Sequence, residues 1–173
     1  MVIGCAGSGK TTLSDILAKK TGLEVTYLDR LYWKPDWQET SKEEWRPMVK
    51  RLAARDSWII DGNYTATMEL RLARAQTVIF LDFPRVACVK GVLRRVREYH
   101  GRQRHDMGEG CTERLDLGFL LWVMRFNRVS RPKILYMLSE YPDLNVITLK
   151  SRKEVNEFTK ELDAEQERSG AER

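Results

Sequence analysis

The sequence predicts an α/β protein built on a parallel sheet, and three observations support this class. Short apolar runs of strand length alternate with longer stretches in which apolar residues recur at helical spacing. The run at residues 77–81 is almost wholly apolar, as expected for a strand that is buried on both faces. The first run leads at once into a glycine-rich turn and a helical pattern. We therefore expect parallel strands joined by right-handed helical crossovers.

The glycine-rich turn at residues 4–11, Gly-Cys-Ala-Gly-Ser-Gly-Lys-Thr, fits the phosphate-binding P-loop pattern G-x-x-x-x-G-K-[ST]. Its glycines let the backbone curl so that successive N–H groups point at phosphate oxygens. Lys10 can reach the β- and γ-phosphates, the Thr11 hydroxyl can ligate Mg²⁺, and the following helix adds its positive dipole end. We expect ATP and Mg²⁺ as cofactors. The predicted contacts are Gly4, Ala6, Gly7, Ser8, Gly9, Lys10, Thr11 and Thr12.

Length and composition favour one globular domain, residues 1–173, that is large enough to bury a core. The chain is 42% hydrophobic and 32% charged, and no apolar run approaches the roughly 20 residues of a membrane span. It opens with no signal segment, and its three cysteines are too widely spaced for a disulfide framework. We expect a cytoplasmic protein without a membrane partner, either a monomer or a homodimer.

The net charge of +5 is unevenly distributed. Residues 85–133 contain twelve Lys and Arg residues against five Asp and Glu, and ten of the twelve are Arg. An excess of Arg over Lys favours bidentate binding of phosphate or carboxylate groups. Nucleotides and nucleic acids both fit this charge, which alone does not distinguish them.

The first half of the chain gives four predicted elements. Leu13, Ile16 and Leu17 predict a helix over residues 10–21, with Gly22 as its C-cap. A strand over 24–28 ends at Asp29, and the aromatic segment 31–40 is expected to be a loop. A helix over 41–55 follows, with a capping box that starts at Thr40 or Ser41. Pro47 conflicts with this helix, so either its first turn is kinked or it begins near Arg46.

The second half continues the alternation. Residues 57–60 predict a strand that ends in Asp61-Gly62, and a short helix over 67–75 and the strand 77–81 follow. Pro84 opens a helix to Tyr99. Further along, the polar, glycine-containing segment 100–115 predicts a mobile loop. Further helices begin at Asp116, Pro132 and Ser151, with a strand at 145–149 and a fraying end beyond Glu161.

This order of elements resembles the nucleoside monophosphate kinase group, which includes adenylate, shikimate and gluconate kinases. The resemblance implies a three-layer α/β/α P-loop NTPase fold with a five-stranded parallel sheet in the order 2-3-1-4-5. It also implies an acceptor-binding subregion at residues 30–56 and a helical, Arg-rich lid with flanking helices at 94–131.

Four motifs resemble a narrower family, the bacterial DNA-topology-modulation (FlaR-type) proteins. They are Tyr-Leu-Asp with Leu-Tyr-Trp-Lys-Pro at 27–35, Trp-Ile-Ile-Asp-Gly-Asn-Tyr at 58–64, Phe-Leu-Asp-Phe-Pro-Arg at 80–85 and Asp-Met-x-x-Gly-Cys at 106–111. The family name rests on a phenotype and identifies no reaction. Pro47 and the short run before Gly4 depart from the expected pattern.

Phosphoryl transfer needs a metal-orienting carboxylate and an acceptor site. Asp61 and Asp82 are the metal candidates, together with Thr11; Asp61 is preferred because Asp61-Gly62 resembles the Asp-Gly of adenylate kinases. Asp82 could instead cap the helix at Pro84. Asp29 resembles the shikimate kinase Asp that contacts the acceptor hydroxyl, so it could act as a general base or simply hold a substrate hydroxyl. The alternative for Asp29 is a turn residue. Aromatic side chains could stack on a base or form core: Tyr32, Trp33, Trp37 and Tyr64.

The arginines fall into three groups. By resemblance, Arg95 and Arg104 belong to the lid arginines that stabilise the transferring phosphoryl group. The other candidates around the lid are Arg94, Arg97, Arg102, Arg125, Arg128 and Arg131. Arg71 and Arg74 could grip an anionic acceptor. A solvated basic face is the alternative for most of these residues.

The sequence therefore favours an ATP-dependent kinase of a small acceptor, with Lys10, Asp29, Asp61, Arg95 and Arg104 as its catalytic residues. A nucleotide-regulated DNA-binding protein that modulates DNA topology is the alternative, although no DNA-binding motif supports it. A nucleotide hydrolase is a third possibility. A zinc site is not expected, because the His and Cys residues lack metal-ligand spacing.

Overall fold

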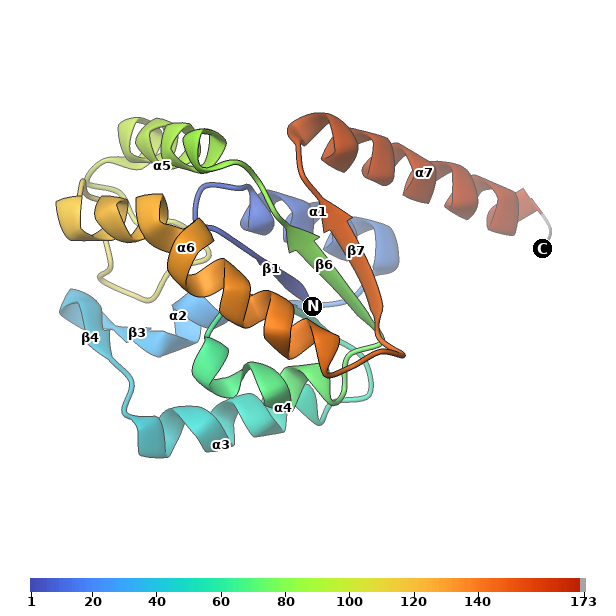
Figure 1. The fold of residues 1–173 in the computed structure, drawn as a ribbon, viewed down its shortest axis with the longest axis horizontal. Helices are drawn as coiled ribbons and strands as arrows, with labels where there is room; N and C mark the ends of the chain where they lie inside the picture. The colour runs from blue at the N-terminus through green and yellow to red at the C-terminus, as the bar shows by residue number, and fades with distance from the viewer. Residues whose placement is uncertain (172–173) are drawn as a thin grey trace.

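A five-stranded parallel sheet forms the centre of the protein in a computed structural model that describes residues 1–171 (Figure 1). Its spatial order is β2-β5-β1-β6-β7, and every neighbouring pair is parallel. The strands are β1 (Val2–Gly4), β2 (Val25–Tyr27), β5 (Ile59–Asp61), β6 (Thr77–Leu81) and β7 (Asn145–Leu149). The numbers differ from the expected 2-3-1-4-5 because two further strands, β3 and β4, intervene along the chain.

Helices cover both faces of this sheet. Figure 1 shows α1 and α7 on one side, and α3, α4 and much of α6 on the other. Among them, α1 packs against α7, α3 against α4, and α5 against α6. Their bounds are α1 (Lys10–Thr21), α2 (Leu28–Tyr32), α3 (Lys42–Ala53), α4 (Met68–Leu72), α5 (Arg85–Tyr99), α6 (Leu117–Ser139) and α7 (Arg152–Ala171). Within the described residues, no helix is long and apolar enough to cross a membrane.

Two apolar clusters hold these layers together. The larger one lies around β1 and β6, where Ile3 and Phe80 are fully buried. The smaller one packs α3 onto the edge of the sheet through Leu28, Trp45 and Val49. Burial of such side chains stabilises a fold by about 1.5–3 kcal/mol each. The second cluster therefore anchors the region between β2 and β5.

Several predicted elements are confirmed. The helix over 10–21 is α1, and the Gly22 N–H closes it by donating to the Ala18 carbonyl at 2.8 Å. β6 and β7 have the predicted bounds. Ser41 caps α3, because its hydroxyl accepts from the Glu44 N–H at 3.2 Å. The alternative start near Arg46 is wrong, because α3 begins at Lys42 and runs through Pro47. Pro47 is exposed, so the backbone carbonyl one turn earlier, which the proline cannot bind, is open to water.

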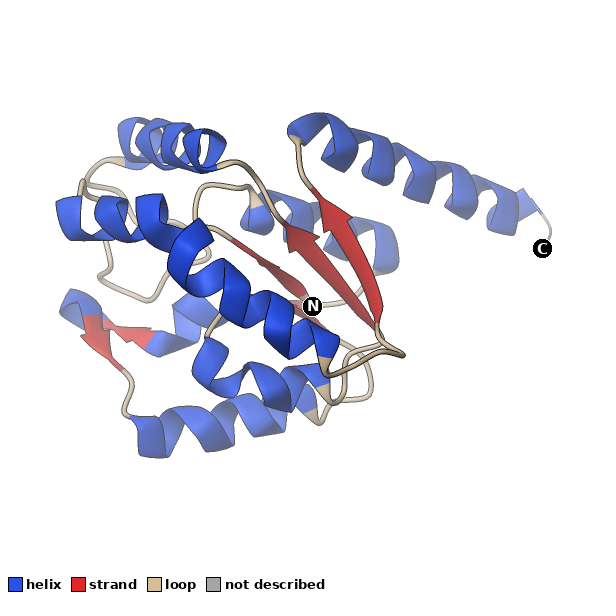
Figure 2. Ribbon diagram, in the orientation of Figure 1, coloured by secondary structure: helices blue, strands red, loops and turns tan. Residues whose placement is uncertain are grey.

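The segment around residues 28–40 corrects the sequence prediction. The second strand stops at Tyr27, and Asp29 lies in the short helix α2 rather than at a strand end. Residues 31–40 are no loop, because β3 (Trp33–Lys34) and β4 (Gln38–Glu39) pair as an antiparallel hairpin, which Figure 2 shows apart from the main sheet. Its 3₁₀ turn, Pro35–Trp37, contains a non-glycine residue at φ 59°, Asp36, and therefore carries no glycine signal.

The second half of the chain also departs from expectation. Residues 100–115 form a loop, as expected, that folds back on itself through bridges joining 100 with 113 and 103 with 112. The mobility of this loop stays a prediction. Pro132 begins no new helix, because α6 continues through it. α7 extends to Ala171, well past Glu161. The bounds of three other elements differ slightly from the prediction. β5 covers Ile59–Asp61, the predicted short helix is the 3₁₀ turn Thr65–Thr67 followed by α4, and α5 starts at Arg85.

Arg71 is a fully buried charge that stabilises the loop after β5. Its guanidinium donates to the carbonyls of Gly62 at 2.7 Å, Tyr64 at 3.3 Å and Asn63. Burial lowers the pKa of Arg71 to about 10, so the side chain stays charged at neutral pH. Arg71 therefore does not serve as the predicted anion grip, because its side chain is fully buried and its two terminal nitrogens donate to backbone oxygens.

We expect the Arg71→Leu variant to lose about 3 kcal/mol of unfolding free energy, because it leaves three carbonyls without their charged donor. Arg74 is exposed and lies two residues beyond the end of α4. The unfolding free energy of the Arg74→Leu variant should stay within about 0.5 kcal/mol of wild type. Urea denaturation measures both variants. Equal stabilities for the two would show that the Arg71 hydrogen bonds do not hold the loop.

Candidate active site

A cleft of about 1110 Å³ opens at the carboxyl ends of the parallel strands. This edge is where open α/β sheets bind their ligands. The loop after β1, the first turn of α1, and the residues that follow β2 and β5 form its floor. Residues of α5, the loop 100–115 and α6 form its other walls. The cleft brings together most residues that the sequence singled out.

The loop between β1 and α1 is shaped by close approach to α5. A Cβ on Gly7 would lie 2.2 Å from the Cys88 carbonyl oxygen, and one on Gly91 would lie 2.0 Å from the Gly7 carbonyl oxygen. Only glycine fits such contacts, and Gly7 and Gly9 also have φ of 79° and 99°. Gly9 is the N-cap of α1 and has no side chain, so the N–H groups of the first turn face the cleft without a side-chain acceptor.

The predicted nucleotide-binding residues divide into those that line the cleft and those that support it. Six line the cleft: Ala6, Gly7, Gly9, Lys10, Thr11 and Thr12. Ser8 is buried and donates to the Cys5 carbonyl at 2.8 Å, which fixes the turn. The Lys10 ammonium donates to the same carbonyl at 3.2 Å. Gly4 lies beneath the loop, against the backbone of Leu81.

Asn63 connects the ends of β1 and β5, a role that the sequence analysis missed. Its side-chain oxygen accepts from the Gly4 N–H at 2.9 Å, and its side-chain nitrogen donates to the Gly4 carbonyl at 2.8 Å. These two bonds hold the residues after β5 against the start of the loop. Its position two residues after Asp61 could have indicated this role, since the carboxyl ends of parallel strands meet at one edge of the sheet.

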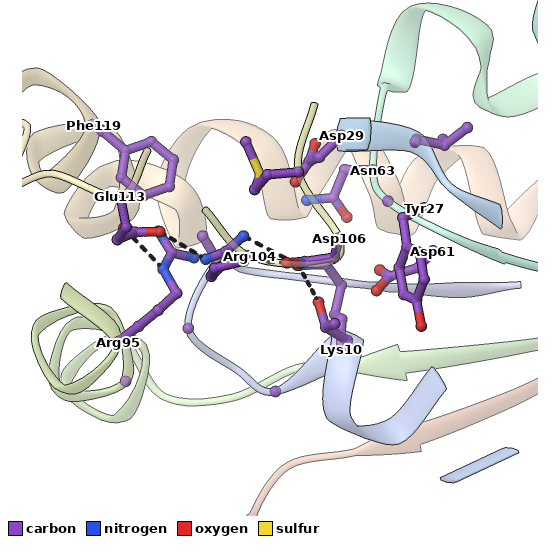
Figure 3. A pocket seen from close by; sticks show the side chains of 18 of the residues that line it. Lys10, Tyr27, Asp29, Asp61, Asn63, Arg95, Arg104, Asp106, Glu113 and Phe119 are labelled. Atoms are coloured by element: carbon purple, nitrogen blue, oxygen red, sulfur yellow. Dashed lines mark hydrogen bonds and ion pairs between the residues drawn. The ribbon is translucent and has the colours of Figure 1, made fainter. Parts of the chain in front are cut away.

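Asp61 lies at the floor of the cleft, where Figure 3 places it beside Tyr27. Its side chain is buried, and that burial raises its pKa to about 7. The Lys10 ammonium opposes the rise, while the carboxylates of Asp29 and Asp106 add to it. Asp61 therefore changes its protonation near neutral pH, unlike an ordinary aspartate.

Asp106 is a second carboxylate that the sequence analysis did not select as a site residue. The Thr11 hydroxyl donates to it at 2.8 Å, across 95 positions of sequence. Arg104 donates to both of its oxygens, at 2.9 and 3.1 Å. The loop 100–115 therefore reaches the first turn of α1. The local signs were its place in the Asp-Met-x-x-Gly-Cys motif at 106–111 and the arginine two residues before it.

Arg104 and Arg95 form one network with a shared carboxylate (Figure 3). Glu113 accepts from Arg104 at 2.9 Å and from Arg95 at 3.1 Å. The Arg95 guanidinium also lies 5.6 Å from the Phe119 ring centroid, a cation–π distance. Burial lowers the pKa of Arg95. Both predicted lid arginines thus line the cleft with their charges partly compensated.

Asp82 does not join the candidate metal residues. Arg131 donates to both of its oxygens, at 2.7 and 2.8 Å, and Asp82 does not line the cleft. The bidentate pair ties the end of β6 to α6. Thr11 and Asp61 remain as the candidate residues whose side-chain oxygens could ligate a cation. Within the described part of the chain, no cluster of three or more His, Cys, Asp and Glu side chains is arranged to hold a metal ion.

Asp29 lines the far part of the cleft, where the Tyr64 hydroxyl donates to it at 2.6 Å. Burial, and then the Asp29 charge, raises the pKa of Tyr64. Tyr64 packs on Tyr32 and Trp45, with ring centroids 4.8 and 4.9 Å apart. Tyr32 is thus core, as the structural alternative expected, and it does not line the cleft.

The remaining arginines separate clearly. Arg94 and Arg114 line the cleft, whereas Arg97, Arg102, Arg125 and Arg128 are exposed and do not. Arg152, at the start of α7, also lines it, and a Cβ on Gly9 would lie 3.2 Å from its guanidinium. The sequence analysis missed Arg152, although its place directly after the last strand put it at the same sheet edge.

Comparison with known proteins gives a narrow result. No known family matches the chain, and no curated protein matches it. A solved structure described as a "putative kinase" from Chloroflexus aurantiacus J-10-fl is similar to it at 15% identity, covering 94% of this chain and 96% of that one, with a TM-score of 0.48. A likeness at this level assigns no activity to the chain. The resemblance to FlaR-type proteins stays a prediction.

The raised pKa of Asp61 predicts a pH-dependent stability. The folded value of about 7 exceeds the ordinary 3.8, so the folded state binds more protons between these values and stability falls as pH rises through them. The Asp61→Asn variant escapes this loss. Its stability relative to wild type should rise by roughly 3 kcal/mol from pH 5 to pH 8, at about 1.4 kcal/mol per pKa unit.

Urea denaturation at the two pH values measures this difference. The exposed Asp56→Asn change serves as the control and should show no such trend. A stability difference for Asp61→Asn that is the same at both pH values would contradict the raised pKa.

Proposed function

We propose that the chain is an ATP-dependent phosphotransferase that acts on a small acceptor. One observation carries the proposal: Lys10, Thr11 and a buried carboxylate meet at the N-terminus of α1, inside a cleft that also contains lid arginines. Phosphoryl transfer depends chiefly on positioning and on neutralising phosphate charge, and this cleft offers the groups for both. The G-x-x-x-x-G-K-[ST] pattern at residues 4–11 supports the same reaction.

The donor side of the reaction falls at the loop and α1. The N–H groups of the first turn and the α1 dipole attract anionic phosphate oxygens. Lys10 would bind the β- and γ-phosphates after leaving the Cys5 carbonyl. Thr11 and Asp61 offer the hydroxyl and carboxylate oxygens that Mg²⁺ prefers, and Mg²⁺ usually takes one or two carboxylates together with phosphates. The ion would supply charge neutralisation for the phosphates.

Arginines supply charge around the transferring group. Arg94, Arg95, Arg104 and Arg152 all line the cleft. Arg95 and Arg104 now share Glu113, and Arg104 also binds Asp106. A phosphate that replaces one of these carboxylates would take over a preformed cation, since carboxylates and phosphates bind guanidinium in the same bidentate way.

Asp29 is the candidate group for the acceptor hydroxyl. It lies in the first turn of α2, and the Tyr64 hydroxyl fixes its carboxylate from one side. The remaining oxygen can accept the hydroxyl proton of an acceptor or hold that hydroxyl in line. DNA binding has weaker support, because Arg95, Arg104 and Arg131 of the basic segment each pair with carboxylates.

We expect Lys10→Ala to lower ATP turnover at least a hundredfold while the protein stays folded, because it removes the cation for the β- and γ-phosphates. Lys19→Ala, on an exposed position of the same helix, is the matched control and should leave turnover unchanged. A coupled assay for ADP release measures turnover, and circular dichroism checks folding. Unchanged turnover in Lys10→Ala would rule out the loop as the catalytic centre.

The product distinguishes transfer from hydrolysis. A phosphotransferase forms a phosphorylated acceptor together with ADP. Free phosphate in full yield, with no phosphorylated acceptor in a broad screen, would indicate a nucleotide hydrolase instead.

A further inference from the structure

Arginines and carboxylates both line the cleft. Figure 3 shows Arg95 and Arg104 on one side of Asp106, and Asp61 and Tyr27 on the other. The second side continues into the hairpin, where Glu39 and two tryptophans, Trp33 and Trp37, line the cleft. Asp15 of α1 lines it as well. We call this part of the cleft the acceptor half; it comprises Asp15, residues 27–39 and residues 61–65. The acceptor half is rich in carboxylates.

Two of the cations near the acceptor half, Arg71 and His105, already have polar partners. Arg71 would be the natural grip for an anionic acceptor, but its two terminal guanidinium nitrogens donate to backbone carbonyls and its side chain is fully buried. His105 lies 3.4 Å from the Asp15 carboxylate. Arg114 also lines the cleft, and its guanidinium lies 5.8 Å from the Trp37 ring centroid, a cation–π contact that does not neutralise its charge. The lining carboxylates of the acceptor half, Asp15, Asp29, Glu39 and Asp61, nevertheless outnumber these cations.

A phosphate group placed in this half would meet like charge. Like charges held close together in a partly buried cleft repel, and a monophosphate carries up to two negative charges. Such repulsion selects against anionic ligands. A neutral or cationic ligand avoids it, and carboxylates accept hydrogen bonds from hydroxyl and amino groups. Trp33 and Trp37 offer apolar faces against which a ring can pack.

We propose that the acceptor is a neutral or cationic hydroxyl compound, of the class of nucleosides, sugars and aminosugars, and not a nucleoside monophosphate or another phosphorylated compound. This assignment rests on the proposed phosphotransferase function. In the reaction the acceptor oxygen forms a bond to the γ-phosphorus of ATP, and the bond from that phosphorus to the β–γ bridging oxygen breaks. ADP leaves with the electron pair, and the hydroxyl proton passes to the Asp29 carboxylate.

Paired acceptors test this proposal. Each pair holds a compound and its phosphorylated form: adenosine with AMP, cytidine with CMP, and glucosamine with glucosamine 6-phosphate. Radiolabel transfer from γ-labelled ATP with Mg²⁺ gives kcat/KM for each. We expect at least one phosphate-free compound to be phosphorylated with a kcat/KM at least tenfold above that of its partner. Preferred transfer to a phosphorylated member, or transfer to no phosphate-free member, overturns the proposal.

A charge-reversal variant sharpens the test. Glu39→Lys should reduce the preference for the phosphate-free member about tenfold, because it replaces a cleft carboxylate with a cation. Glu43→Lys, on the exposed first turn of α3 and outside the cleft, makes the same charge change and should leave the preference unaltered. Equal effects of the two variants would attribute the preference to the overall field and would overturn the role of the acceptor half.

Titration of the wild-type protein with Mg-ATP separates the two levels of inference. If ATP does not bind, the proposed function fails. If ATP binds and is used to phosphorylate AMP or CMP in preference to the nucleosides, the function stands and the acceptor assignment fails.

Discussion

The position of β1 between β5 and β6 is the constraint on which the site depends. Because all three strands are parallel, their carboxyl ends meet at one edge of the sheet. The loop 4–11, Asp61 and Asn63 therefore converge although they are far apart in the sequence. The two hydrogen bonds between Asn63 and Gly4 continue this pairing beyond the strands. Any change in strand order would separate the lysine and threonine from the buried carboxylate.

Close backbone contacts then bring the walls of the cleft against this floor. Gly91 allows α5 to touch the carbonyl of Gly7, and Gly108 allows the loop 100–115 to touch the carbonyl of Trp33, where a Cβ would lie 1.8 Å from that oxygen. Asp106 completes the arrangement by binding both Thr11 and Arg104. The loop therefore reaches both α1 and the hairpin, and under the proposed function a nucleotide would compete with Asp106 for the Thr11 hydroxyl.

The sequence was most informative where function depends on local geometry. The pattern at 4–11 predicts α1 and the placement of Lys10 and Thr11, and apolar runs predict β6 and β7. The resemblance to adenylate kinases favours Asp61 over Asp82, and the structure places only Asp61 in the cleft. Where a residue's position follows from its immediate neighbours, periodicity and motif spacing were sufficient to predict that position.

Residues whose roles depend on distant partners were not predictable in this way. Asp106 is defined by a threonine 95 positions away, and Asp82 by an arginine 49 positions away. Arginine is a residue type that often binds anions, yet the burial of Arg71 among backbone carbonyls gives it a structural role. The hairpin β3–β4 lacks a glycine turn signal, so its aromatic residues suggested a loop. Long-range contacts, rather than local propensity, decided each of these cases.

A crystal structure of the protein with Mg²⁺ and a non-hydrolysable ATP analogue tests the central claim most directly. The account predicts the triphosphate against the N–H groups of residues 7–11, Lys10 on its β- and γ-phosphates, and Asp106 displaced from Thr11 by the metal and phosphates. A triphosphate bound elsewhere, with the Thr11–Asp106 hydrogen bond intact, would contradict it.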